Sequence, residues 1–365
     1  EKLGDDVRQH LGNGVRIHER SDFERTLRTL GGRRIVVDPE RAVAAIFAAL
    51  EGAGATIVAK RDPAVLPKAT KNEAEIAGHQ AAQARDGAAV ARFLHWLSVE
   101  APRGGLDEMK ASDKLEQFRR EGGDLRDLSF PTISGSGANG AVVHYRASEE
   151  TNRPIAPDSL YLVDSGGQYP DGTTDITRTV AIGTPSAEMR DRYTRVLKGH
   201  IALARAIFPS GTRGSQLDML ARQYLWQAGV DYAHGTGHGV GSYLAVHEGP
   251  QRIATFGGGD EPLRPGMIIS NEPGYYKTGE YGIRIENLVL VIALDLPGAE
   301  KPMLGFETLT HAPIDRTLID LALLTDEERG WIDDYHARVK ALIGPQLDGE
   351  AKAWLEAACA PLRTR

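Results

Sequence analysis

The 365-residue sequence predicts an α+β protein with an antiparallel sheet, preceded by part of an α/β unit. Two features lead to this prediction. Segments with helical periodicity alternate with two blocks of short apolar segments joined by glycine-rich turns, an order typical of helices packed on an antiparallel sheet. Ahead of these blocks, residues 33–60 show strand, helix and strand patterns in turn, which is typical of a β-α-β unit.

The first element is this β-α-β unit. Residues 34–37 form a short apolar strand, and Asp38-Pro39 supplies an N-cap and a proline at the first helical position. Residues 41–50 have a helical pattern that glycines end, and residues 56–59 form the second strand. Because one such unit cannot cover both faces of a sheet, we interpret residues 1–66 as the remnant of a larger N-terminal domain.

A linker is expected at Asp62-Pro63 and Leu66-Pro67, followed by a long helix. Asn72 is placed to cap this helix, and Glu75 at its third position completes a capping box. The remaining expected elements are a helix at 112–121, strands at 141–145, 160–164 and 176–182, helices at 187–208 and 215–228, strands at 267–271 and 281–292, and a helical hairpin from Thr325.

Composition excludes several classes of function. The net charge is −7 and basic residues form no run, so the sequence predicts no nucleic-acid partner. The longest apolar run, residues 42–50, is too short to span a bilayer, so no membrane partner is predicted. Cys359 is the only cysteine, which rules out an internal disulfide and fits a reducing cytoplasm.

Two aspartates stand where buried strands begin or end. Asp164 ends the apolar run 160–163, and Asp175 opens the strand at 176–182. Asp164 taken alone is better explained as a residue that caps a turn, and Asp175 could also be a turn residue. Hairpin pairing of the two strands would bring the carboxylates side by side, and their repulsion would favour a cation between them.

The second strand block repeats this arrangement with glutamates. Glu272 ends the apolar run 268–271, and Glu286 lies within the run 283–290. Period-two alternation places Arg284 and Glu286 on one face, where a solvent-exposed ion pair is the alternative interpretation. The apolar neighbours favour a central strand, in which an unpaired carboxylate would be costly.

Four histidines, His144, His234, His238 and His247, occur in the central region of the chain. Any one of them alone is more often structural than a ligand. The stretch His-Gly-Thr-Gly-His-Gly-Val-Gly at 234–241 is too rich in glycine for a helix, so a loop is expected. Together, four carboxylates and one imidazole favour two Mn, Fe, Co or Zn ions sharing one water, which suits amide hydrolysis.

In residue type, order and spacing, Asp164, Asp175, His238, Glu272 and Glu286 resemble the five ligands of the pita-bread metallopeptidases. Further stretches, 128–134, 163–166, 171–175, 234–241 and 282–287, are similar to those of the cytosolic three-domain Xaa-Pro aminopeptidases. The resemblance covers residues 71–345 and implies a pita-bread fold. It also implies an N-terminally truncated chain, with a catalytic domain at 71–300 and a C-terminal extension containing the helical hairpin at 301–365.

The resemblance also implies a role for each matching residue. Asp164 would bind one ion in a bidentate manner and Asp175 would bridge, while His238 and Glu272 would hold the second ion and Glu286 would bridge. Glu272 would also accept a proton from the bridging hydroxide. The family's substrate-binding positions are matched by His144 and His247, which would stabilise the tetrahedral intermediate, and by His234, Tyr276 and Arg284 on the proline side.

The implied activity is removal of an N-terminal residue ahead of proline with two divalent ions, most often Mn²⁺, in a cytoplasmic homodimer. Its substrates would be peptides with proline at the second position. Three other enzymes share the implied fold: an Xaa-Pro dipeptidase, a methionine aminopeptidase and a creatinase. A creatinase would lack the metal ligands, so the dipeptidase is the main alternative. A catalytically silent binding scaffold is the alternative of a different class, and it would be expected to lack ligands.

Overall fold

The structure is a computed structural model and describes residues 3–243, 245–257 and 259–362. The chain divides into two compact units, Glu1–Val65 and Leu66–Arg365. The expected domains at 1–66, 71–300 and 301–365 remain a prediction, and their outermost residues, 1–2 and 363–365, lie outside the described residues. Among the described residues, no helix combines the length and apolar character needed to cross a bilayer.

The first unit contains the predicted β-α-β arrangement. Its elements in chain order are α1 (Asp5–Leu11), η1 (Gly12–Gly14), α2 (Asp22–Arg28), β1 (Arg34–Val37), α3 (Ala44–Gly52) and β2 (Thr56–Ala59). Strands β1 and β2 pair in parallel, with Arg34 opposite Thr56, which confirms the predicted unit. Leu50 and Ala49 of α3 are buried in it.

The predicted start of α3 was wrong. The helix begins at Ala44 with Val43 at its N-cap position and without a side-chain cap. The carboxylate of Asp38 instead accepts hydrogen bonds from the amides of Glu40 and Asp62, both at 2.9 Å. A contact to a residue 24 positions away therefore replaces the local cap that the sequence suggested.

The second unit opens with helices. They are α4 (Val65–Ala69), α5 (Glu73–Glu100), η2 (Ala101–Arg103) and α6 (Glu108–Glu121). The capping box of Asn72 and Glu75 is confirmed at the start of α5. The boundary between the two units falls within the linker expected at Asp62-Pro63 and Leu66-Pro67. Part of this linker is helical, because Pro67 lies in the first turn of α4, where a missing amide hydrogen is tolerated.

The strands of this unit pair antiparallel throughout the described residues, as predicted. Strands β4, β5 and β8 form one sheet, and β12, β15, β16 and β9 form another. The bounds are β3 (Asp127–Leu128), β4 (Ile133–Ser136), β5 (Ser159–Ser165), β6 (Gly167–Tyr169), β7 (Gly172–Thr173), β8 (Ile176–Ile182), β9 (Phe208–Pro209), β10 (Gly237–His238), β11 (Arg252–Ile253), β12 (Ile268–Asn271), β13 (Gly274–Lys277), β14 (Tyr281–Arg284), β15 (Asn287–Leu294) and β16 (Met303–Thr308).

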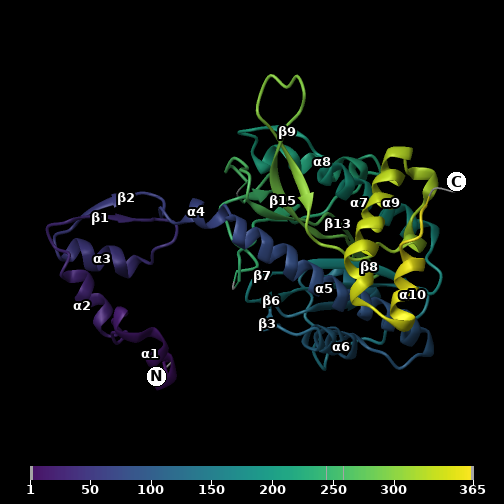
Figure 1. The fold of residues 1–365 in the computed structure, drawn as a ribbon, viewed down its shortest axis with the longest axis horizontal. Coiled ribbons are helices and arrows are strands. Elements are labelled where there is room, and N and C mark those ends of the chain that lie inside the picture. The colour runs from purple at the N-terminus through teal and green to yellow at the C-terminus, as the bar shows by residue number, and fades with distance from the viewer. Residues whose placement is uncertain (1–2, 244, 258, 363–365) are drawn as a thin grey trace. The chain divides into compact units, whose positions relative to one another are not determined.

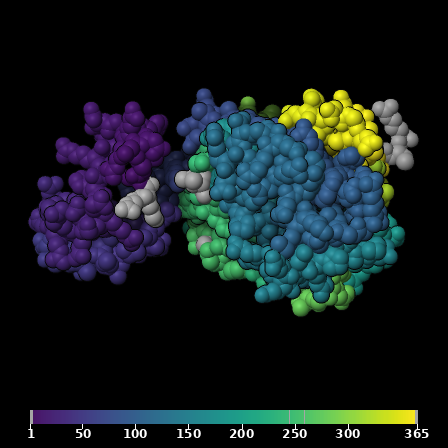
Figure 2. Space-filling view, turned by 90° about the horizontal axis from the view of Figure 1, so that it is seen from below, coloured from purple at the N-terminus to yellow at the C-terminus, as the bar shows by residue number. Residues whose placement is uncertain are grey.

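Helices cover these sheets. The remaining helical elements are η3 (Gly137–Ala141), α7 (Ala187–Ala204), α8 (Gly214–Trp226), η4 (Arg316–Leu318), η5 (Leu321–Leu323), α9 (Asp326–Ile343), η6 (Gly344–Gln346) and α10 (Gly349–Ala358). Figure 1 shows α9 and α10, in yellow, beside α5. Figure 2 shows that α5, α6 and their connections, in blue, form much of the face of this unit seen from that side. The capping box of Thr325 and Glu328 confirms the predicted start of the hairpin.

Three further predicted elements differ from the structure. Ala141 ends η3, and the residues that follow it up to Tyr145 form a bend and a turn rather than a strand, with the amide of Tyr145 donating to the carbonyl of Val142 at 3.0 Å. Helix α7 ends at Ala204, four residues earlier than expected, because Phe208 pairs with Leu304 in a strand. The strand expected at 281–292 breaks after Arg284 and resumes as β15.

The break between β14 and β15 falls at the predicted ligand Glu286. Strand β14 pairs with β13, whereas β15 pairs with β12 and β16. Between them the amide of Glu286 donates to the carbonyl of Thr177 in β8 at 3.1 Å. The chain thus changes partners at Glu286, and this contact joins the two main sheets where the candidate site lies.

Candidate metal centre

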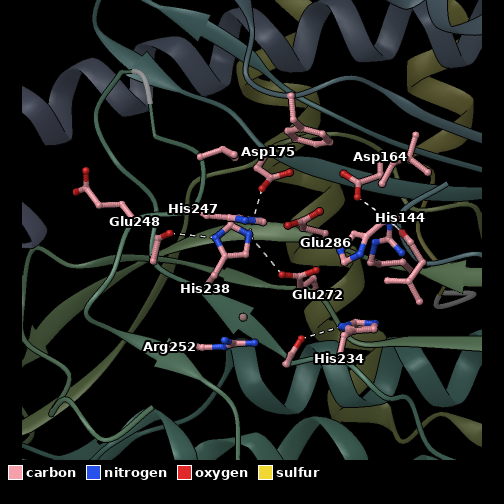
Figure 3. A pocket seen from close by; sticks show the side chains of 18 of the residues that line it. His144, Asp164, Asp175, His234, His238, His247, Glu248, Arg252, Glu272 and Glu286 are labelled. Atoms are coloured by element: carbon pink, nitrogen blue, oxygen red, sulfur yellow. Dashed lines mark hydrogen bonds and ion pairs between the residues drawn. The ribbon is translucent and has the colours of Figure 1, made fainter. Parts of the chain in front are cut away.

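A cavity of about 740 Å³ opens among these strands in the second unit. Its wall combines residues of β4, β5, β11 and β14 with the glycine-rich loop around β10 (Figure 3). Asp175 lies directly before β8, Glu272 directly after β12, and Glu286 directly before β15. The predicted site residues that line it are His144, Asp164, Asp175, His234, His238, His247, Glu272, Arg284 and Glu286. The tenth, Tyr276, contacts two of these side chains through its hydroxyl.

Strand register places the two aspartates. Asp164 pairs with Thr177, and Ser165 with Ile176, so Asp175 lies just before the first paired residue of β8. Gly166 in the turn lies against the neighbouring backbone, where an added Cβ would come within 1.8 Å of the Thr174 carbonyl. The hairpin predicted from the sequence therefore forms, and a side chain at Gly166 would push its strands apart.

The glycine-rich segment is a loop with one two-residue strand, β10, as predicted. A Cβ at Gly237 would come within 2.0 Å of the Ser270 carbonyl, and one at Gly239 within 2.0 Å of the Glu248 carbonyl. The alternating glycines let the loop lie directly on β12 and on its own return segment. This contact brings the imidazole of His238 to the carboxylates.

His238 is oriented by its backbone neighbour. Its Nδ1 lies 3.0 Å from the carbonyl oxygen of Gly239, a contact that requires a hydrogen on Nδ1. Its Nε2 lies 3.3 Å from Oδ2 of Asp175 and 3.5 Å from Oε1 of Glu272. With a hydrogen on Nδ1, the ring directs Nε2 toward two carboxylates, a position from which it can bind a cation together with them.

Burial and mutual repulsion perturb the carboxyl groups. Burial raises the pKa of Asp175 well above its usual value, and the charges of Asp164 and Glu272 add to this shift. The pKa of Glu286 is raised by burial and then by Asp175 and Glu272, and burial also raises the pKa of Glu272. The fold therefore brings several carboxyl groups close together without enough cationic side chains to compensate all of their negative charge.

A chain of hydrogen bonds runs along one side of the cavity. Nη2 of Arg284 donates to Oδ2 of Asp164 at 2.6 Å, and Nη1 donates to the hydroxyl of Tyr276 at 2.6 Å. That hydroxyl also contacts Nε2 of His234 at 2.8 Å. Arg284 is buried and bonded to Asp164, so the solvent-exposed pair with Glu286 that the sequence left open is wrong.

Two other histidines face the cluster. The ring of His247 lies edge-on to that of His238, with centroids 4.1 Å apart. The side chain of His247 is exposed to solvent, but desolvation by the cavity wall lowers its pKa to about 4, and His238 contributes to this shift. His144 is exposed on the rim of the same cavity.

The side chains fit a divalent metal centre. Ligand atoms of Asp175, His238 and Glu286 all lie within 4.8 Å of one another. Within the described part of the chain, Oδ1 of Asp164 and Oε1 of Glu286 are buried and have no hydrogen-bond partner. Buried oxygens without donors, beside one imidazole nitrogen, match the donor preference of Mn, Fe, Co or Zn.

Sequence reasoning missed several residues that support or line the site. Thr177 donates from Oγ1 to Oε2 of Glu286 at 2.7 Å, and Arg178 donates from Nη1 to the backbone carbonyl of Glu286 at 2.7 Å. A signal existed for this pair, because Thr177-Arg178 interrupts the apolar pattern of β8. Glu248 and Arg252 also line the cavity, and no local sequence pattern distinguishes them.

Comparison with known families gives matches to three successive parts of the chain. A sequence model described as metallopeptidase family M24 matches residues 77–293. Models of the creatinase/prolidase N-terminal domain and of the C-terminal region of the M24 peptidases match residues 1–75 and 302–362.

Curated relatives include a probable Xaa-Pro aminopeptidase P of Laccaria bicolor, 43% identical over 99% of this chain and 58% of the relative. Aminopeptidase P1 of Lotus japonicus is 46% identical over 84% of this chain and 50% of the relative. The chain thus spans between half and three fifths of the length of these two proteins.

Solved structures give a consistent result. The X-prolyl aminopeptidase of Caenorhabditis elegans, described as a cytosolic enzyme with a di-nuclear active site, is 37% identical with a TM-score of 0.90, covering 99% of this chain and 61% of that one. An Xaa-Pro dipeptidase of Bacillus anthracis is 28% identical with a TM-score of 0.66, covering 80% and 77%. These likenesses confirm the predicted α+β pita-bread fold.

Proposed function

Because the chain belongs to metallopeptidase family M24, we propose that it removes the N-terminal residue from peptides with proline at the second position, using two divalent cations. The relatives named as Xaa-Pro aminopeptidases support this proposal. The observation that carries it is the buried cluster of carboxylates around His238, in which two oxygens lack any described protein partner. Such a cluster is costly unless positive charge is bound to it.

In this proposal the cations are held by Asp164, Asp175, His238, Glu272 and Glu286. When bound, two divalent cations lower the pKa of a shared water and neutralise charge that develops on the attacked carbonyl oxygen. The unpartnered Oδ1 of Asp164 and Oε1 of Glu286 support their assignment as ligands.

Glu272 is the proposed proton acceptor. Burial raises its pKa, so its carboxylate accepts a proton at neutral pH more readily than an exposed glutamate does. Oγ of Ser270 donates to its Oε1 at 2.9 Å and holds the carboxylate toward His238. The proton then leaves with the departing amine.

His144, His247 and His234 are the proposed substrate-binding imidazoles. With its pKa lowered to about 4, His247 is neutral at pH 7, so it donates a hydrogen bond without adding a charge beside the ligands. His234 is also neutral, because burial lowers its pKa to about 3, and it is held by Tyr276. Before proline the substrate has no amide hydrogen, so recognition there relies on shape.

An Xaa-Pro dipeptidase is the second candidate, favoured by the likeness to the Bacillus anthracis structure. A binding scaffold without activity is the third, but the intact set of ligand side chains does not favour it. We further propose that the metal is Mn²⁺, that the protein is cytoplasmic and that it forms a homodimer. The oxygen-rich ligand set supports Mn²⁺, and the description of the nematode enzyme as cytosolic supports the location.

The deciding experiment is release of the first residue from Arg-Pro-Pro by metal-loaded protein, with Arg-Ala-Pro and the dipeptide Arg-Pro as controls. We expect rapid cleavage of the first peptide, little of the others, and loss of turnover on chelation. Preference for the dipeptide would favour a dipeptidase. Absence of both turnover and stoichiometric metal would favour the scaffold.

A further inference from the structure

Among the residues that the structure describes, the cavity wall contains a half-buried cation, Arg252, for which no acidic partner is found. Three arginines line the cavity: Arg284 is bonded to Asp164, Arg146 is exposed at the rim, and Arg252 is half-buried. Within residues 3–243, 245–257 and 259–362, Arg252 forms no ion pair, and its hydrogen bond runs from Nη1 to the Gly257 carbonyl at 3.0 Å. Its Nε is buried and lacks a partner. A buried donor without an acceptor is costly, so the guanidinium group of Arg252 can bind an acceptor that enters the cavity.

Strand pairing directs Arg252 toward the proposed catalytic centre. Arg252 in β11 is the cross-strand partner of His238 in β10. Directly opposed residues of an antiparallel pair project from the same face, so both side chains lie on the cavity side. Figure 3 shows Arg252 extending below the ring of His238, on the side away from Asp175.

A glycine makes room for the guanidinium group. An added Cβ at Gly235 would lie 3.0 Å from Nη2 of Arg252 and 3.2 Å from its Nε. Any larger residue at position 235 would crowd the group that faces the cavity. Because Gly235 also lines the cavity, the guanidinium has a backbone on one side and open volume on the other.

The cavity wall therefore carries groups of opposite charge, the carboxylates around His238 and the guanidinium group of Arg252. In the proposed function the carboxylates and their cations would bind the reacting end of a peptide, and Arg252 would provide a cationic group for another part of it. A tripeptide in extended conformation spans roughly 10 Å, which a cavity of about 740 Å³ can hold. Its C-terminal carboxylate would then fall on the leaving-group side of the cleaved bond.

We propose that Arg252 is a specificity-determining residue that binds a substrate carboxylate downstream of proline, through the paired donors of its guanidinium group. This inference rests on the proposed aminopeptidase function and adds the class of peptide preferred: short peptides with a free C-terminus, or peptides acidic after proline. Guanidinium and carboxylate groups match in planar, two-point geometry, and burial strengthens such contacts.

The test compares three peptides with metal-loaded protein: Arg-Pro-Ala with a free carboxylate, the same peptide amidated, and amidated Arg-Pro-Asp. Loss of one charge-assisted contact corresponds to about tenfold to hundredfold in kcat/KM. We expect the amidated Ala peptide to be poorer by this factor than the free acid. The change should lie in KM, because the contact is equal in ground and transition states. The value of kcat/KM for the amidated Asp peptide shows whether a side-chain carboxylate can replace the C-terminal carboxylate as the group that Arg252 binds.

Variants assign any preference to its residue. In Arg252→Gln the ratio of acid to amide should fall to about one, with metal content retained. Arg252→Lys should retain part of the preference for the free-acid peptide over the amidated one, because lysine keeps the charge and loses the two-point geometry. Arg146→Gln, which removes an exposed arginine from the same cavity, is the matched control and should keep the wild-type ratio.

Three results would overturn the inference: no acid preference in the wild type, an unchanged ratio in Arg252→Gln, or its loss in Arg146→Gln. Each of these leaves the proposed function intact, because the peptides are still cleaved ahead of proline. Absence of turnover of every peptide by metal-loaded wild-type protein would contradict both proposals.

Discussion

Replacing Glu248 by glutamine should destabilise the loop that carries His247. The Oε1 of Glu248 lies 3.2 Å from Nζ of Lys71, whose side chain is fully buried, and its Oε2 lies 2.8 Å from Nζ of Lys68. Figure 3 shows Glu248 pointing away from the ring of His238, toward neither Asp175 nor Glu286. The ion pair between Glu248 and Lys71 therefore attaches the loop that carries His247 to the residues just before α5, on the side of the loop away from the carboxylates.

The magnitude follows from the two contacts. At 3.2 Å the attraction between Glu248 and Lys71 is about 5 kcal/mol for an effective dielectric constant of about 20. Desolvation offsets part of this, but removing one partner leaves an uncompensated buried charge, which costs about 3–5 kcal/mol. Lys68 is 66% exposed and contributes at most about 1 kcal/mol. We expect Glu248→Gln to lose about 3 kcal/mol or more in the free energy of unfolding.

The pH dependence of this loss has a defined sign. Burial lowers the pKa of Lys71, and Glu248 opposes that shift. Without Glu248 the pKa falls further below its unfolded value, so the unfolded chain binds more protons and stability of the variant rises with pH. The deficit relative to wild type should therefore be larger at pH 6 than at pH 9.

Urea titration of metal-loaded wild type, Glu248→Gln, Lys71→Met and the double variant measures this coupling. The double variant should lose less free energy of unfolding than the two single variants lose together, because it buries no unpaired charge. A second measurement should show lower kcat on Arg-Pro-Pro with unchanged metal content in Glu248→Gln. A loss below about 1 kcal/mol would show that the pair behaves as a surface salt bridge and refute the reasoning.

Three further outcomes are expected. His144→Ala should slow hydrolysis at least tenfold while metal content stays unchanged, since this imidazole binds substrate; loss of metal in elemental analysis would make it a ligand instead. Asp175→Asn and Glu286→Gln should each abolish turnover. In wild-type protein without metal, the raised pKa of both acids means that the free energy of unfolding falls as pH rises from about 4, and thermal unfolding at several pH values measures this fall. Gly282→Ala should cost more than about 3 kcal/mol by urea titration, because its Cβ would lie 1.7 Å from the Gly140 carbonyl; a loss under about 1 kcal/mol would contradict this packing.

Local patterns predicted the parts of the fold that local contacts determine. Asn72 with Glu75 and Thr325 with Glu328 form the two predicted capping boxes, each closed within four residues. The polar residues at strand ends also stood out, because a carboxylate beside an apolar run has few structural explanations. Asp164 is an example, since it follows four apolar residues in β5.

Contacts between distant segments account for the errors. The apolar residues at 141–145 resemble a strand, but the backbone there packs against Gly282 and turns instead. The strand at 281–292 breaks because Glu286 bonds to Thr177, more than 100 positions away. Arg252 could not be identified as a cavity residue, because only its pairing with His238 in β10 places it there.

The proposed activity depends most directly on where divalent cations bind to the protein. Anomalous diffraction from crystals of the Mn²⁺-loaded protein would locate them. We expect two peaks per chain, both among the side chains of Asp164, Asp175, His238, Glu272 and Glu286. A single peak, or ions bound elsewhere while these five side chains contact only water, would contradict this proposal.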